Sequence, residues 1–168
     1  YVKPNEDFLA WHDGKKKVYQ DYFLTDHINR GGSYSGSYLV MSMAVAKFLK
    51  GRYEKLIIAG LSQGGAATLL NAIQSEPDIA IVASGYSSLN EKFEENGPNQ
   101  IMGVRMQSMV NDGEKLREIL GNMTTRFLFT WGLKERWGFY EVEANEKITA
   151  GLLNGLLNVW CEIHDGGH

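Results

Sequence analysis

Residues 55–73 read KLIIAGLSQGGAATLLNAI, and this stretch decides the fold. It opens on a short apolar run typical of a buried strand and closes on an Ala- and Leu-rich run typical of a helix. Between them, Gly60 to Gly64 form a G-x-S-x-G turn centred on Ser62. Strand, tight turn and helix in this order are the sequence form of a nucleophile elbow, which holds a serine in a strained backbone conformation. The two glycines are expected where strand and helix pass too closely for a Cβ.

An alternative interpretation gives Ser62 a purely structural role. A serine just before a helix often accepts a hydrogen bond from an N–H of the first turn and so caps the helix. The strand before the turn and the helix after it favour the elbow, because the short motif alone also occurs by chance.

The rest of the chain alternates between strand-like and helix-like stretches. Strands are predicted at 18–25, 56–59, 79–85, 126–131 and 156–163, and helices at 37–50, 63–74, 113–120 and 140–153. The strands are continuously apolar, which predicts a sheet covered on both faces, and their alternation with helices predicts parallel pairing. We therefore expect one α/β domain over residues 1–168, with a loop, short lid or insertion at about 86–111.

Composition narrows the classes of partner and cofactor. A chain of 168 residues with a net charge of −3 has room for one core and lacks the basic surface that nucleic acid or an anionic membrane needs. No apolar run approaches the ~20 residues of a membrane span. The absence of a signal peptide slightly favours the cytoplasm and leaves the compartment open. Nothing has the spacing of a metal site or a phosphate-binding loop, so no metal and no cofactor is predicted.

The single cysteine, Cys161, has no partner for an internal disulfide. It lies in an apolar stretch, so we expect a buried strand residue.

A serine nucleophile needs a base to take its proton. The histidines are His12, His27, His164 and His168. The order serine, acid, histidine suits a parallel sheet, and catalytic groups gather where its strands end. His168, just past the last predicted strand, is therefore the favoured base, with an exposed terminal residue as the alternative. His164 is a weaker candidate, and the other two precede the elbow.

The acid that orients the base should follow a strand between the serine and His168. Glu135 follows the predicted strand 126–131 and is our candidate, with an ordinary surface carboxylate on a charged loop as the alternative. Competing acids are Glu91 and Asp165, of which the latter is better placed to brace a turn.

Negative charge on a substrate carbonyl oxygen needs N–H donors aimed at it. One is the backbone N–H of Gln63, the residue after the nucleophile. A second donor is left open between residues 12–14 and 29–31. Aromatic residues near the site either line an acyl or sugar pocket or pack the core and a short lid; they are Tyr34, Tyr38, Trp131, Trp137, Phe139 and Tyr140.

These residues together resemble the α/β-hydrolase family, from about residue 18 to the end. The elbow 60–66 is similar to that of its small esterases and acyl thioesterases, and 29–33 resembles the R-G-x-G-x-S loop that often precedes the helix before the elbow. The segment 132–135 resembles the one that carries the family's acid, more often Asp, and 167–168 the one that carries its histidine.

The resemblance implies a three-layer, mostly parallel sheet with helices on both faces. The family usually has more sheet before this point and a helix after its histidine, so the fold is expected to be shortened at both ends. The chain is then either a fragment or a reduced form of the fold. A further N-terminal segment or a partner chain would complete it.

The implied function is hydrolysis of a small-molecule carboxylic ester or thioester by Ser62, His168 and Glu135 through an acyl-enzyme intermediate. Two alternatives stay open. The same three residues suit an acyltransferase, and a catalytically silent module of this fold would instead bind a ligand or partner.

Overall fold

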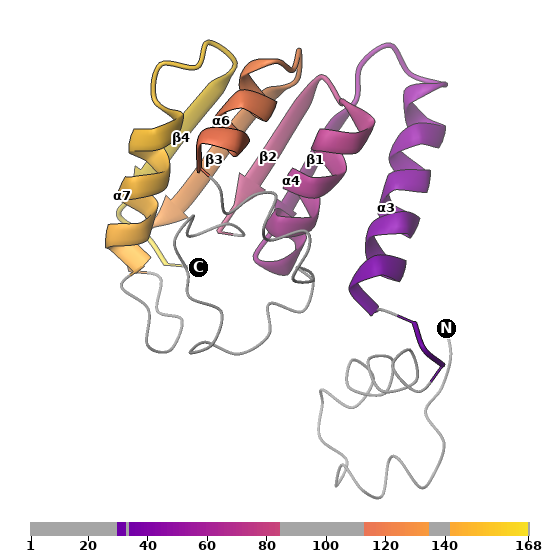
Figure 1. Cartoon of the computed structure of the whole chain (residues 1–168), viewed down its shortest axis with the longest axis horizontal. Coiled ribbons are helices and arrows are strands. Elements are labelled where there is room, and N and C mark those ends of the chain that lie inside the picture. Colours follow the sequence, from indigo (N-terminus) through magenta and orange to yellow (C-terminus); the bar gives the residue numbers. More distant parts are fainter. Residues whose placement is uncertain (1–29, 33, 85–112, 135–141, 168) are drawn as a thin grey trace, which may run out of the picture.

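The computed structural model describes residues 30–32, 34–84, 113–134 and 142–167 (Figure 1). In chain order its elements are α3 (Tyr34–Lys50), β1 (Ile57–Leu61), α4 (Gln63–Ser75), β2 (Ile79–Ala83), α6 (Gly113–Gly121), β3 (Arg126–Gly132), α7 (Val142–Leu153) and β4 (Val159–His164). The four strands pair parallel in the order β1-β2-β3-β4. The predicted α/β class and parallel sheet are therefore confirmed.

The predicted elements that fall on described residues are all present, with modest shifts of their ends. The α3 helix begins at Tyr34 rather than Ser37, and β4 begins at Val159 rather than Leu156. The later start of β4 reflects a turn after α7, in which the Leu156 N–H donates to the carbonyl of Leu153. The strand predicted at 18–25 and the lid predicted at 86–111 lie outside the described residues.

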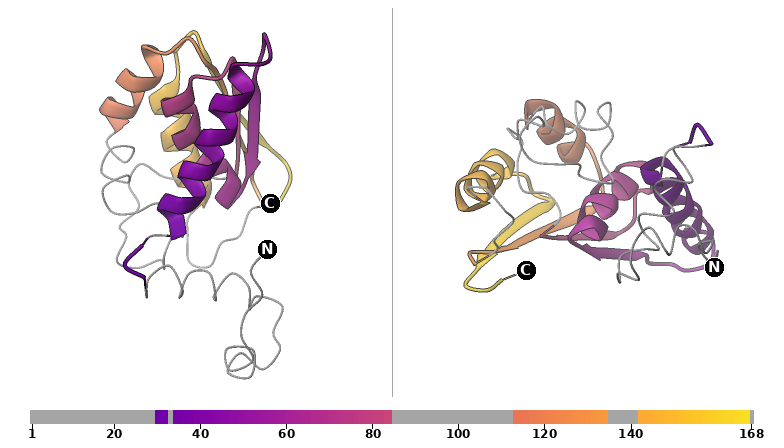
Figure 2. Two further views of the ribbon diagram at one scale, coloured as in Figure 1. Left: turned by 90° about the vertical axis from the view of Figure 1, so that its right-hand side faces the viewer. Right: turned by 90° about the horizontal axis from the view of Figure 1, so that it is seen from below.

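All four described helices lie on one face of the sheet (Figure 2). Strands that follow one another along a parallel sheet are joined by right-handed crossovers, and these put α4, α6 and α7 on the same side. The α3 helix precedes β1 and lies on this side because it packs against α4. On the opposite face the side chains of β2 are half-buried, whereas Ile57 and Leu61 on β1 are 58% and 57% exposed. Helices on both faces therefore stay a prediction.

The core lies between the sheet and this helix layer. Phe127, Phe129 and Trp131 alternate along β3, are almost completely buried, and stack with ring centroids 6.2 and 5.9 Å apart. Leu69 of α4 and Leu116 of α6 are fully buried against them. Trp131, which the sequence left open as a pocket residue, is thus a core residue.

The outer side of α3 is apolar and exposed. This helix packs on α4 through Leu39 and Ala46 and stands beyond the edge strand β1 (Figure 1). Val40 and Met41 are exposed by 66% and 70%, and no described strand pairs with the free side of β1. An open edge with apolar neighbours is unusual in a finished sheet. Completion of the sheet by a further segment or partner chain stays a prediction.

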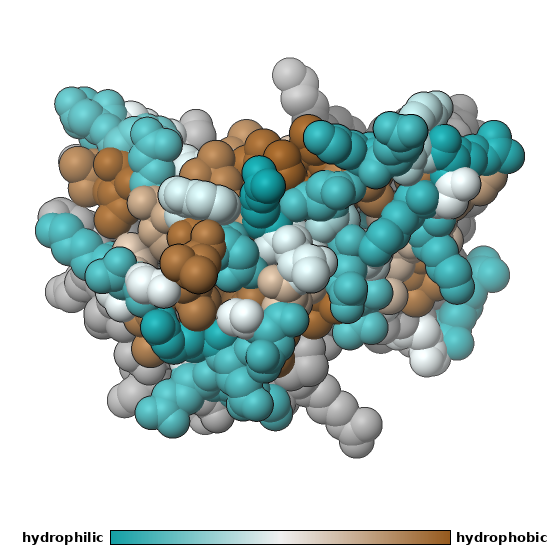
Figure 3. All heavy atoms as spheres, turned by 90° about the horizontal axis from the view of Figure 1, so that it is seen from above, coloured by the Kyte–Doolittle hydropathy of each residue, from teal (hydrophilic) through white to brown (hydrophobic). Residues whose placement is uncertain are grey.

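The amino ends of the strands present a mixed surface. Seen from that end, apolar patches are broken up by polar side chains (Figure 3). Within the described ranges, no helix combines the length and apolarity needed to cross a membrane.

Candidate active site at the carboxyl edge of the sheet

Ser62 is the single residue that connects β1 to α4, and it has an unusual backbone conformation. Its φ of 58° and ψ of −124° lie where residues with a Cβ are rarely found. Its N–H donates to the carbonyl of Ala83 on the neighbouring strand at 2.9 Å, and its own carbonyl accepts from Gly65 and Ala66 at 2.9 and 3.2 Å. These bonds fix the turn from both sides, so the strain of about 1–3 kcal/mol is held by its surroundings.

The turn needs a glycine on its strand side. A Cβ on Gly60 would meet the main-chain carbonyl of Gly64 and lie 2.6 Å from Oγ1 of Thr68. A Cβ on Gly64 would meet nothing within 4 Å. The expectation that a Cβ would clash is therefore confirmed at Gly60 and wrong at Gly64. A Cβ on Gly60 would point at the backbone of Gly64, whereas a Cβ on Gly64 would point into open space.

The capping interpretation of Ser62 is wrong. Its side chain makes no capping hydrogen bond to α4. The Oγ atom is therefore not held by the helix that it precedes. Gln63 is the first residue of α4, where helix geometry leaves the backbone N–H without an intrahelical acceptor. A hydroxyl and a helix N-terminus that favours negative charge thus lie next to each other.

The loops that follow the four strands leave from one edge of the sheet. Three backbone hydrogen bonds connect neighbouring strand ends there: Ser62 N–H to Ala83, Ser84 N–H to Thr130, and Leu133 N–H to His164, each 2.9 Å long. The carboxyl ends of parallel strands are where such sheets bind ligands. The candidate site accordingly lies along this edge, at the carboxyl ends of the strands.

A second serine at this edge was not singled out from the sequence. Ser84 follows β2 and has a φ of 48°, also in the left-handed region. Ser84 follows β2 as Ser62 follows β1, because the preceding residues Leu61 and Ala83 are paired in the sheet. Unlike Ser62, it does not lie in a G-x-S-x-G pattern. Its left-handed φ carries no signal in the sequence.

The segments after β3 and β4 contact each other closely. The Lys134 N–H donates to the carbonyl of Gly166 at 2.7 Å, and Lys134 Nζ lies 2.8 Å from Oδ1 of Asp165. This ion pair is well exposed and therefore worth little. The Asp165 carboxylate thus lies beside Lys134, and its assignment as a brace of the turn after β4 stays a prediction.

The described residues bring only part of the predicted site together. Ser62 and the backbone of Gln63 are placed at the edge, whereas Glu135 and His168 lie outside the described residues, directly after Lys134 and Gly167. Other candidates from the sequence also lie outside the described residues: Glu91, His12 and His27, the loop 12–14, and Trp137, Phe139 and Tyr140.

His164 is an unsuitable base for Ser62. It is the exposed last residue of β4, three strand spacings from β1, and these correspond to ~14 Å. Its ring instead lies over Gly166, where an added Cβ would stand 2.6 Å from Nδ1.

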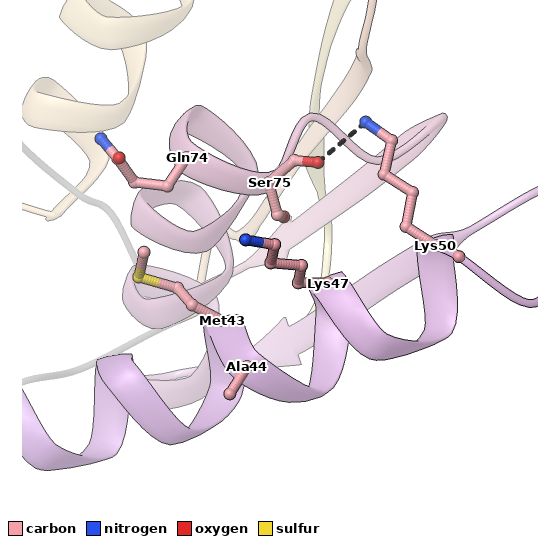
Figure 4. A pocket seen from close by; sticks show the side chains of 7 residues that line it. Met43, Ala44, Lys47, Lys50, Gln74 and Ser75 are labelled. Atoms are coloured by element: carbon pink, nitrogen blue, oxygen red, sulfur yellow. Dashed lines mark hydrogen bonds between the residues drawn. The ribbon is translucent and has the colours of Figure 1, made fainter.

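A cavity of about 550 Å³ lies between α3 and α4, away from the candidate site (Figure 4). Its lining includes Met43, Lys47 and Gln74, and Lys50 Nζ donates to the carbonyl of Ser75 at 3.0 Å. Ser75 ends α4, so this cavity is ~20 Å along the helix from Ser62. Lys50 thus caps the carboxyl end of α4, and the cavity takes no part in the candidate site.

The remaining reactive group is the thiol of Cys161 on β4. It is half-buried, and burial raises its pKa to about 11. The thiol is thus protonated near neutral pH and a poor nucleophile. In the described part of the chain, no three His, Cys, Asp or Glu side chains gather as they would around a metal ion.

No family model, curated protein or solved structure matches this chain.

Proposed function

We propose that the chain is a serine hydrolase that cleaves a carboxylic ester or thioester through an acyl-enzyme intermediate. The observation that carries the proposal is the backbone of Ser62: φ 58° and ψ −124° at a strand-to-helix junction, with a side chain that does not cap the helix. A non-glycine residue held in a sparsely populated conformation points to a functional constraint. Here the constrained residue bears a hydroxyl at the edge where ligands bind.

In the proposed reaction, His168 takes the proton of the Ser62 hydroxyl while Oγ attacks the substrate carbonyl carbon. The N–H of Gln63 donates to the oxygen that becomes negatively charged. His168 then passes the proton to the departing alcohol or thiol, leaving an ester on Ser62. A water then gives a proton to His168 as its oxygen attacks that ester, and His168 returns the proton to Ser62 Oγ as the acid is released. Glu135 holds and stabilises the charged imidazole.

The reach of the chain supports this assignment of the base. Gly166 and Gly167 lie against Gly132 at the end of β3, which is two strand spacings or ~10 Å from β1. Gly167 and His168 together extend by up to ~7 Å, and the imidazole side chain supplies the rest. The base is therefore within reach of Ser62 without any rearrangement of the described strands.

The test is covalent labelling with a fluorophosphonate probe. The parent chain should be labelled, Ser62→Ala should not, and Ser84→Ala should be labelled like the parent. Ser84 is a matched control, because it is also a serine with a left-handed φ at the same edge. Equal labelling of Ser62→Ala and the parent would refute the proposal.

A further inference from the structure

Gly132, the last residue of β3, contacts the turn after β4 more closely than any side chain would allow. A Cβ at this position would lie 2.5 Å from the carbonyl oxygen of Gly166 and 2.8 Å from that of Gly167. Both neighbours are main chain and cannot rotate aside. Gly132 does not have a left-handed φ, so the close approach, and not its own backbone angle, requires a glycine here.

Two hydrogen bonds hold this contact in place. Leu133 N–H donates to the carbonyl of His164 at 2.9 Å, and Lys134 N–H donates to that of Gly166 at 2.7 Å. The second bond extends past the end of the regular strands and joins the turn of β4 to the loop of β3. We call residues 132–134 and 164–167 the β3–β4 loop contact.

The contact shortens the path from β4 to the serine. A residue that follows β4 directly starts ~14 Å from β1. Gly166 and Gly167 lie against Gly132 at the end of β3, which is ~10 Å from β1. Only Gly167 separates Gly166 from His168. The contact therefore fixes the point at which the chain leaves the sheet after β4, against the end of β3 rather than beyond β4.

We propose that Gly132 is a positioning residue for the base: its lack of a Cβ lets the turn after β4 lie against β3, and this directs His168 toward Ser62. The inference rests on the proposed function. Gly132 acts through His168 and touches no reacting atom. A misplacement of about 1 Å in a catalytic group lowers rates by ~100-fold, so an added Cβ should be felt strongly.

The experiment compares fluorophosphonate labelling rates of the parent and Gly132→Ala, with Gly151→Ala as the matched control. A Cβ on Gly151 of α7 would meet nothing within 4 Å, so this variant should be labelled like the parent. Gly132→Ala should be labelled ~100-fold more slowly, with unchanged circular dichroism. A folded Gly132→Ala that is labelled at the parent rate would overturn the inference.

A double-mutant cycle separates positioning from general damage. If Gly132 acts through His168, adding Gly132→Ala to His168→Ala should lower the labelling rate no further, because the group that it positions is already gone. A full additional loss in the double variant would show a merely structural role. Failure of the proposed function gives a different result, since the parent chain itself would then not be labelled at Ser62.

A second pair of variants covers the case that Gly132→Ala does not fold. Lys134→Ala removes the exposed ion pair and keeps the N–H that bonds Gly166, whereas Lys134→Pro removes both. We expect Lys134→Pro to be labelled at least ~10-fold more slowly than Lys134→Ala, because only the proline removes the N–H that bonds Gly166. Equal rates for the two variants would overturn the inference.

Discussion

Replacing Ser62 by glycine should stabilise the fold while removing the nucleophile. The Ser62 backbone, with φ 58° and ψ −124°, is strained for any residue with a Cβ and relaxed for glycine. The strain is worth about 1–3 kcal/mol. Glycine also gains freedom in the unfolded chain, which offsets about 0.4–1 kcal/mol. The net gain over the parent is therefore about 0–2.6 kcal/mol, with a midpoint of about 1.3 kcal/mol.

The useful comparison is between Ser62→Gly and Ser62→Ala, because both lack the hydroxyl and only the alanine keeps the Cβ. We expect Ser62→Gly to be the more stable by about 1–2 kcal/mol, a rise in Tm of roughly 2–6 °C for a chain of this size. Urea unfolding followed by tryptophan fluorescence measures it, since Trp131 is 1% exposed in the core.

The result needs no substrate and tests the backbone conformation alone. Glu76→Gly provides a reference, since Glu76 has a φ of 45° at the end of α4, in the milder left-handed helical region. If Ser62→Gly is no more stable than Ser62→Ala, the residue is not strained and the main support for an elbow is lost.

Three further changes test other parts of the account. Gly60→Ala should destabilise the fold by at least ~2 kcal/mol, because its Cβ would clash with backbone and with Thr68 Oγ1; a urea midpoint equal to the parent's would contradict this close approach. Asn158→Asp should cost about 1–3 kcal/mol in the same assay, since Asn158 Nδ2 donates to one carbonyl in the last turn of α6 and to two that follow it; no loss would mean that these bonds do not hold the turn. The raised pKa of Cys161, about 11, predicts a stability contribution that is present at pH 8 and is lost as the pH rises toward 11, because the unfolded thiol ionises first. Cys161→Ala should lack this decline, and identical pH profiles for variant and parent would refute it.

Local sequence patterns were sufficient to predict most of the described helices and strands. The apolar run before Gly60 and the Ala- and Leu-rich run after Gly64 were sufficient to predict β1, α4 and the strained turn between them, since each pattern is set by neighbours in sequence. Parallel pairing followed from the alternation of strands and helices.

Features that depend on contacts distant in sequence could not be predicted. The role of Gly132 arises from the backbone of Gly166, 34 positions further on, and the left-handed φ of Ser84 has no local pattern. The same limit explains why the sequence implied two helix layers: continuous apolar strands indicate a need for cover on both faces but not which segment supplies it.

The proposed function depends on activation of the Ser62 hydroxyl by His168. Peptide mass spectrometry of the fluorophosphonate-treated parent and of His168→Ala tests it most directly. We predict a single phosphonyl group on Ser62 in the parent and at least ~100-fold slower modification of the same residue in His168→Ala. Modification of another serine, or an unchanged rate at Ser62 without His168, would contradict the account.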